Sequence, residues 1–275
     1  MTRRTMDHAV ILAFLGVVLL VAASPVVTPP DPSLASIGRY LPGYVPREEL
    51  PDASVLLPAP PDSDATAVDD AVSRRSLSRR DTARWGLAVE DANLVFPHAA
   101  GTFSCALGAP ITTGDTPALY RLLRRSSSDA GLSTGKVKDR YQRLRPLAVN
   151  GQPVCTPDER ARLMKSGSFP SAHAAIGWAW ALILAEIAPE RAGAVLARGR
   201  AFGQSRVVCN AHWQSDVEAG QLVGAVAVAR MHASPEFRAD VEAARVELAS
   251  ARAGGLPPSR DCAAEKAALT PVPPP

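Results

Sequence analysis

Residues 171–187 read SAHAAIGWAWALILAEI, and this stretch decides the fold. Apolar side chains such as Ile176, Trp180 and Ile183 occupy nearly every face of the helix that the stretch would form. A helix that is apolar all the way round is buried on all sides. Pro189 follows the stretch and cannot continue the helix. We therefore predict a buried central helix over residues 171–187.

Ser or Thr followed by proline marks further helix starts, because the hydroxyl caps the helix and proline fits its first position. Such pairs occur at Thr116-Pro117, Thr156-Pro157 and Ser234-Pro235. Glu159 lies three residues after Thr156, as in a capping box, and Gly254-Gly255 is a fitting end for the last helix. Another helix is expected over residues 191–202. Alternating strand patterns are scarce, so the sequence predicts an all-α domain.

The composition is that of a folded domain with an excess of proline. Hydrophobic residues make up 47% of the 275 residues and charged residues 21%, which excludes wholesale disorder. The formal net charge of +3 is too small to indicate a nucleic-acid-binding protein by charge alone. The 25 prolines crowd both ends. We therefore predict a Pro-rich extended arm over residues 24–64, one helical domain over 65–255, and a disordered Pro-rich tail over 256–275.

The N-terminus has the pattern of a secretory signal peptide. Arg3 and Arg4 precede an uninterrupted apolar run from Ala9 to Ala23, which is shorter than the about 20 residues that span a bilayer. We predict a signal peptide over residues 1–23, with an uncleaved N-terminal anchor as the alternative. No later segment is apolar over a sufficient length, so we expect no membrane association after signal cleavage and a periplasmic or secreted protein.

Four cysteines are present, namely Cys105, Cys155, Cys209 and Cys262. An even number in an exported chain indicates two disulfides, for which three pairings are open. Four buried thiols are the alternative. No CxxC or HxxxH spacing occurs, so no metal site is predicted.

Three short segments stand out by residue type. The first, KDRYQRLRP at residues 138–146, places Lys138 and Arg145 seven residues apart, so that both can face one site from two turns of a helix. Pro146 favours an extended conformation for Arg145. The second, GSFPSAH at residues 167–173, is a turn that runs into the start of the central helix. The free N–H groups and the helix dipole attract anions there.

The third segment, SRVVCNAHWQSD at residues 205–216, contains a His–Asp pair. In a helix, the four-residue spacing would put Asp216 on the face of His212, and Ser205 would lie on that face too. A carboxylate that accepts the imidazole N–H fixes the tautomer and makes the other ring nitrogen more nucleophilic. Arg206 lies off that face, so we expect a loop or helix break between Arg206 and His212.

Together the segments form an ordered set, K-x6-R-P at Lys138 to Pro146, P-S-x-H at Pro170 to His173, and S-R-x5-H-x3-D at Ser205 to Asp216. The set resembles the phosphatidic acid phosphatase type 2 (PAP2) superfamily. The flanks GSFPS, GQSRV and HWQSDV resemble its bacterial class A non-specific acid phosphatases, over roughly residues 38–250. The resemblance implies a helical bundle of the acid phosphatase–vanadium haloperoxidase type.

The resemblance also implies the residue roles. His212 would attack phosphorus and form a phosphohistidine, Asp216 would hold its other ring nitrogen, and His173 would act as general acid and base. The implied phosphate-binding residues are Lys138, Arg145, Ser171, Ala172, Ser205 and Arg206. The implied enzyme is a secreted acid phosphatase of broad range that needs no metal or cofactor and hydrolyses small phosphomonoesters, with phosphotransfer to alcohols left open. Class A relatives also favour the pairing Cys155–Cys209, which leaves Cys105–Cys262.

One position departs from the family pattern. Ala172 replaces the family's glycine and adds a methyl group near the site, so activity would be reduced or the substrate range changed. Two alternative functions belong to other classes of protein. A vanadate-dependent haloperoxidase would hold vanadate on His212, and a phosphate-ester binding protein would be silenced by Ala172. The sequence leaves the natural substrate and homo-oligomerisation open.

Overall fold

The computed structural model describes residues 41–61 and 66–270. The predicted signal peptide, residues 1–23, lies outside these residues, as does the first part of the predicted arm. Every regular element of the described chain is helical, which confirms the all-α prediction. Within the described residues, no helix combines the length and the apolar character that a membrane crossing requires.

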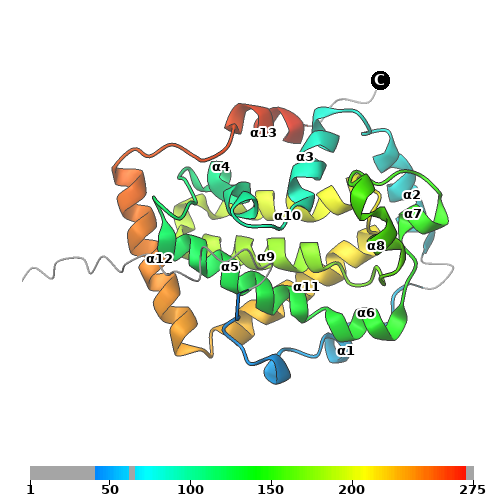
Figure 1. Cartoon of the computed structure of the whole chain (residues 1–275), viewed down its shortest axis with the longest axis horizontal. Coiled ribbons are helices and arrows are strands. Elements are labelled where there is room, and N and C mark those ends of the chain that lie inside the picture. Colours follow the sequence, from blue (N-terminus) through cyan, green and yellow to red (C-terminus); the bar gives the residue numbers. More distant parts are fainter. Residues whose placement is uncertain (1–40, 62–65, 271–275) are drawn as a thin grey trace, which may run out of the picture.

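The central helix is α9, Ala172–Ile187, and Ser171 caps it by accepting a hydrogen bond from the Ala174 N–H. Figure 1 shows α9 in the middle of the bundle, where it contacts α5, α10, α11 and α12. Trp180 is fully buried, and its indole N–H donates to the Leu123 carbonyl at 2.8 Å. The apolar stretch at residues 171–187 therefore forms the buried core helix that its composition predicts.

The elements around α9 pack closely against it. These are α5 (Pro117–Leu132), α10 (Ala192–Val208), α11 (Gln214–Met231) and α12 (Pro235–Ala253). A Cβ atom on Gly220 of α11 would lie 2.3 Å from the Ser171 carbonyl oxygen. Only glycine allows α11 to approach the start of α9 so closely. This contact brings the segment 205–216, which leads into α11, next to the segment 167–173, which leads into α9.

The shorter elements complete the bundle. They are the α-helices α1 (Ala53–Leu56), α2 (Thr66–Leu77), α3 (Ala83–Ala92), α4 (Ser104–Leu107), α6 (Gly135–Tyr141), α7 (Pro146–Val149), α8 (Arg160–Met164) and α13 (Cys262–Leu269), and the 3₁₀ turns η2 (Arg47–Glu49), η3 (His98–Phe103), η4 (Pro157–Glu159) and η5 (Pro189–Arg191). The first and last regular elements of the described residues, η2 and α13, are therefore both short.

Two of the three Ser/Thr-Pro starts open long helices, α5 and α12. The third does not, because Pro157–Glu159 forms a 3₁₀ turn ahead of the five-residue helix α8. The capping-box prediction there is wrong, since the Thr156 hydroxyl bonds the Glu159 carboxylate at 3.3 Å and caps no backbone N–H. The helix expected over residues 191–202 begins at Ala192 and continues to Val208.

The described part of the N-terminal arm is fastened to the bundle. The Tyr44 backbone N–H donates to Asp129 of α5 at 2.8 Å, and the Tyr44 hydroxyl donates to Asp240 of α12 at 2.7 Å. Arg125 of α5 stacks over the Tyr44 ring, 4.0 Å from its centroid. These contacts hold residues 41–45 across two helices of the domain.

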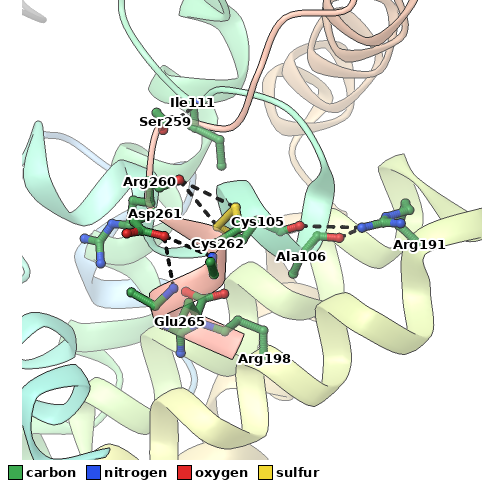
Figure 2. The surroundings of a disulfide bond; sticks show 12 residues. Cys105, Ala106, Ile111, Arg191, Arg198, Ser259, Arg260, Asp261, Cys262 and Glu265 are labelled. Carbon is green, nitrogen blue, oxygen red and sulfur yellow. Dashed lines mark hydrogen bonds and ion pairs between the residues drawn. A yellow bond between two sulfur atoms is a disulfide. The ribbon is translucent and has the colours of Figure 1, made fainter. Parts of the chain in front are cut away.

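The expectation of a disordered tail is wrong up to Thr270. Helix α13 occupies Cys262–Leu269, and the Asp261 carboxylate caps it by accepting from two backbone N–H groups. A disulfide joins Cys262 to Cys105, the pairing that the family resemblance implies, and Glu265 forms an ion pair with Arg198 of α10. The prolines before α13 lead into a short alanine-rich helix that these bonds fix to the domain. Figure 2 shows this attachment.

Candidate active site

The three sequence segments meet at a cavity of about 480 Å³. Its lining includes the ends of α3, α6 and α10 and the start of α9. The implied site residues among its lining are Lys138, Arg145, Ala172, His173, Arg206 and His212. The fold therefore brings together six residues that span 75 positions of the sequence, counted from 138 to 212.

Lys138 and Arg145 share the cavity without sharing a helix. Helix α6 ends at Tyr141, Gln142 has a φ of +43°, and Arg145 is extended with ψ 155°. The expectation of two turns of one helix is therefore wrong, whereas the extended Arg145 before Pro146 is confirmed. The two cations converge on one turn, because both donate to the Gly167 carbonyl, Lys138 at 3.2 Å and Arg145 at 3.1 Å.

Gly167 has to be glycine for this turn to form. A Cβ atom there would lie 2.7 Å from the Lys138 carbonyl oxygen, which belongs to the backbone and cannot yield. The close approach of these two segments places both cations in the wall of the same cavity.

Arg206 is fully buried at the end of α10 and lines the cavity. Its Nε and Nη2 atoms have no hydrogen-bond partner among the described residues. A buried donor without a partner is costly, and a buried cation more so. An anion in the cavity could satisfy both donors, which is compatible with the phosphate-binding role that the resemblance implies for Arg206.

His212 is held from both ring nitrogens. Its Nδ1 lies 3.3 Å from the Asp216 carboxylate, and its Nε2 lies 2.8 Å from Nη1 of Arg145. A guanidinium can only donate, so Nε2 must carry a lone pair and Nδ1 the proton. The neutral tautomer with a nucleophilic Nε2 inside the cavity is therefore the one that the contacts select.

The His–Asp contact forms without the helix expected at His212. Helix α10 ends at Val208, as a break before His212 requires, and α11 begins only at Gln214. Asp216 lies in the first turn of α11 and accepts the Trp213 backbone N–H at 2.8 Å. The carboxylate therefore caps α11 while its other contact orients the imidazole.

Burial and neighbouring cations set the protonation states in the cavity. Burial, followed by Arg145 and Lys138, holds the pKa of His212 well below its usual value, so His212 is neutral. Burial and Arg206 likewise lower the pKa of His173. Burial and Arg145 lower the pKa of Lys138 to about 7. An anion bound among the basic side chains would oppose the part of each shift that neighbouring positive charges cause, whereas the larger effect of burial would remain.

His173 lies in the first turn of α9, and its Nε2 is 3.0 Å from the Ala92 carbonyl at the end of α3. A carbonyl only accepts, so Nε2 keeps its proton and Nδ1 is the nitrogen free to exchange one. The contact places the general acid implied by the resemblance on the α3 side of the cavity.

Two of the implied phosphate ligands do not line the cavity. The Ser205 hydroxyl donates to Asp91 of α3 at 2.5 Å and accepts from Arg84 at 2.9 Å. Ser205 therefore ties α10 to α3, whose Ala92 carbonyl contacts His173, and its placement does not support the phosphate-binding role. Ser171 is buried and caps α9 through its hydroxyl.

Ala172 is the first residue of α9 and is among the residues that line the cavity. Its φ is not among the positive values of the chain, so the backbone accepts alanine without strain. The departure from the family pattern therefore changes the space in the cavity and leaves the backbone fold intact.

Sequence reasoning missed the residue that supports Asp216. Arg143 donates to Asp216 at 2.7 Å and to Asp69 of α2 at 2.8 Å, and it also bonds the Ser215 hydroxyl. Arg143 lies inside the first segment, but no spacing rule distinguishes it from the other basic residues there. The cavity wall also contains Arg162 and Glu159, neither of which belongs to the three segments.

The second disulfide joins Cys155 to Cys209, directly after α10. The Cys155 N–H also donates to the Cys209 carbonyl at 3.2 Å. The pairing is again the one that the resemblance implies, and it braces the turn between Arg206 and His212. Within the described ranges, no three His, Cys, Asp or Glu side chains gather where they could hold a metal ion.

The described residues form an all-helical bundle with a cavity lined by basic side chains and with a His–Asp contact. These features indicate the class of protein to which the chain belongs. The PAP2 superfamily model matches residues 127–239, which contain all three segments. Together with relatives that are 38% and 42% identical over 75% of the chain, this match shows that the chain belongs to the PAP2 superfamily.

Relatives of known description cover most of the chain. It is 42% identical over 209 residues to the non-specific acid phosphatase of Providencia stuartii, covering 75% of this chain and 84% of the relative. It is 38% identical over 209 residues to the acid phosphatase of Zymomonas mobilis, covering 75% and 79%. It is 39% identical over 204 residues to the non-specific acid phosphatase of Salmonella typhimurium, covering 73% and 82%.

Proposed function

We propose that the protein is a phosphoric monoester hydrolase, an acid phosphatase that cleaves small phosphomonoesters through a phosphohistidine on His212. The observation that carries the proposal is the position of His212, whose Nε2 faces Arg145 while its Nδ1 faces Asp216. The names of the relatives support the phosphatase class, and the geometry of the cavity supports the mechanism.

In the first step Nε2 of His212 attacks phosphorus and the bond from phosphorus to the leaving oxygen breaks. His173 gives the proton on its Nδ1 to that oxygen, so the product leaves as a neutral alcohol. Asp216 stabilises the positive charge that develops on the His212 ring. Lys138, Arg145 and Arg206 offset the charge on the three phosphoryl oxygens, which is the main catalytic task in phosphoryl transfer.

In the second step a water molecule attacks phosphorus and the bond from phosphorus to Nε2 breaks. His173 takes a proton from the water, so both histidines return to their starting states and inorganic phosphate leaves. No step calls for a metal ion, because the three cations supply the positive charge.

The mechanism requires a neutral His212 together with a protonated His173. Bound phosphate monoester would raise the pKa of His173, whose low value in the free protein reflects burial and Arg206. We therefore expect an acidic-to-neutral optimum, with activity falling as His173 loses its proton at higher pH.

The direct test is hydrolysis of an aryl phosphate by His212→Ala in the presence of EDTA. The matched control is His232→Ala, because His232 lies at the end of α11 away from the cavity. We expect the His212 variant to lose nearly all activity, and the control and the wild type to keep theirs in EDTA. Substantial activity of His212→Ala would remove the nucleophile, and loss of wild-type activity in EDTA would remove the metal-free scheme.

We also propose that the protein is exported to the periplasm or secreted. The predicted signal peptide and the two disulfides support this, because disulfides persist in oxidising compartments. Fractionation of the native host, followed by N-terminal sequencing of the mature protein, tests the proposal. A protein retained in the cytoplasm with its leader intact would contradict it.

A further inference from the structure

A second cavity of about 860 Å³ adjoins the catalytic one. The two share four lining residues, namely Glu90, Asn93, Val95 and His98. The second cavity continues from this shared wall along α3 to α13, at the C-terminal end of the described chain. The two cavities therefore lie side by side along these residues.

The far wall of this second cavity is held firmly. The disulfide from Cys262 to Cys105 fixes the start of α13, and Glu265 accepts from Nε of Arg198 at 3.1 Å. Arg260 donates to the His98 carbonyl at 2.9 Å and so joins the α13 side to the shared wall. Helix α13 is thus a fixed wall of the cavity.

The chemistry of the walls selects an uncharged, apolar occupant. Two of the charged side chains are already engaged: Glu265 pairs with Arg198, and Arg260 donates to the His98 carbonyl at 2.9 Å. Asp261 is occupied as the cap of α13. The remaining surface is largely apolar and includes Leu87, Val95, Phe96, Ile111, Ala264 and Ala268.

The proposed reaction points the leaving group in this direction. In an in-line displacement the leaving oxygen lies opposite the attacking nitrogen, near the general acid. His173 is bound to the Ala92 carbonyl, one residue before Asn93 of the shared wall. His173 lines the catalytic cavity together with all four shared residues, so an alcohol protonated by its Nδ1 departs into a space that the shared wall bounds.

We propose that the cavity between α3 and α13 is the subsite for the leaving group, and that it favours bulky apolar alcohols such as aryl groups. This inference rests on the proposed phosphatase function. It adds a substrate preference to that function and assigns the preference to the chain's own C-terminal helix.

The test fills the cavity from each of its two walls. Ala264→Trp projects from α13, and Gly86→Leu projects from α3, where an added Cβ would meet nothing within 4 Å. The matched control is Ala263→Trp, an exposed neighbour on α13 that does not line the cavity. Each protein is assayed with 1-naphthyl phosphate and with glycerol phosphate, and 1-naphthol binding is measured by calorimetry.

We expect kcat/KM for 1-naphthyl phosphate to fall by roughly tenfold or more in both filling variants, as for other losses of apolar fit in a substrate pocket. Glycerol phosphate hydrolysis and the Ala263→Trp control should stay at the wild-type level. Equal losses for both esters, or no loss for either, would overturn the subsite.

The naphthol measurement separates this inference from the proposed function. A wild-type protein that hydrolyses neither ester would end the phosphatase proposal. Naphthol binding that is lost in Ala264→Trp would still support an apolar subsite, and binding that is unchanged in both filling variants would contradict it.

Discussion

Nη1 of Arg145 lies 2.8 Å from Nε2 of His212 inside the catalytic cavity. Because arginine can only donate, this contact requires the lone pair on Nε2 and leaves the proton on Nδ1, next to Asp216. The same arginine would bind a phosphoryl oxygen once substrate enters. One residue thus selects the tautomer of His212 in the free protein and, in the proposed mechanism, would also stabilise charge during the reaction.

Replacing Asp216 by Asn should abolish most activity. The amide has no charge to stabilise the His212 ring and can donate to Nδ1, which would shift the proton to Nε2. We expect kcat to fall roughly 10³- to 10⁴-fold, as for the comparable aspartate of a catalytic triad. Asp240→Asn is the control, because that buried carboxylate serves Tyr44 and Arg121 and should affect stability alone. A kcat of Asp216→Asn close to wild type would show that this carboxylate is dispensable.

Replacing Arg143 by Met should move the acid limb of the pH profile. Burial raises the pKa of Asp216, and the ion pair with Arg143 opposes that rise. Without Arg143 the carboxylate takes up a proton at higher pH, so the acid limb of kcat/KM should shift upward by about one pH unit or more. Arg143→Lys should restore part of the difference, and the exposed Arg140→Met should leave the profile unchanged. A lower kcat with an unshifted profile would assign Arg143 a purely structural role.

Anion binding should strengthen as the pH falls. The free protein holds the pKa of Lys138 at about 7 through burial and Arg145, and a bound dianion favours the charged amine. Binding therefore takes up a proton, and sulfate, which stays a dianion, should bind about tenfold more tightly at pH 6 than at pH 8. The measurement is the sulfate-induced rise in Tm at matched ionic strength.

Lys138→Met is the control for that experiment, because it removes the titrating amine and should flatten the pH dependence. Sulfate stabilisation that is equal at the two pH values, or larger at pH 8, would contradict the assigned role of Lys138.

Much of the helical architecture is predictable from local sequence. The apolar stretch 171–187 and the Ser234 cap predict α9 and α12, because burial and capping act within one helix. The sequence analysis does not predict α13, although Asp261 supplies a cap. The prolines on both sides favour a disordered tail more strongly than the short alanine-rich stretch favours a helix. Thr156 has a capping-box pattern but leads into a 3₁₀ turn.

The site is only partly predictable for a different reason. The three segments contain six residues that line the cavity, but their spacing does not identify the residues that support them. Arg143 reaches Asp69 across 74 residues, and Ser205 reaches Asp91 across 114. Such contacts depend on how helices pack, which no local spacing encodes.

Restoring glycine at position 172 should improve substrate binding. The methyl group of Ala172 lines the cavity, and its removal enlarges the space near the phosphoryl group. We expect KM for an aryl phosphate to fall a few-fold in Ala172→Gly, with a small loss of stability from the added backbone freedom. Ala174→Gly, at a buried position off the cavity, should lower Tm without changing KM. An unchanged KM for Ala172→Gly would show that the methyl does not hinder substrate.

The most direct test of the proposed mechanism is to trap the phosphoryl group on the protein. In His173→Ala, 4-nitrophenyl phosphate should still phosphorylate the enzyme, because its leaving group needs no proton, whereas hydrolysis of the intermediate lacks its base. After an alkaline quench, mass spectrometry should find one phosphoryl group, located on His212. A phosphoryl group on another residue, or release of nitrophenol in a burst without any phosphorylated protein, would contradict a phosphohistidine at His212.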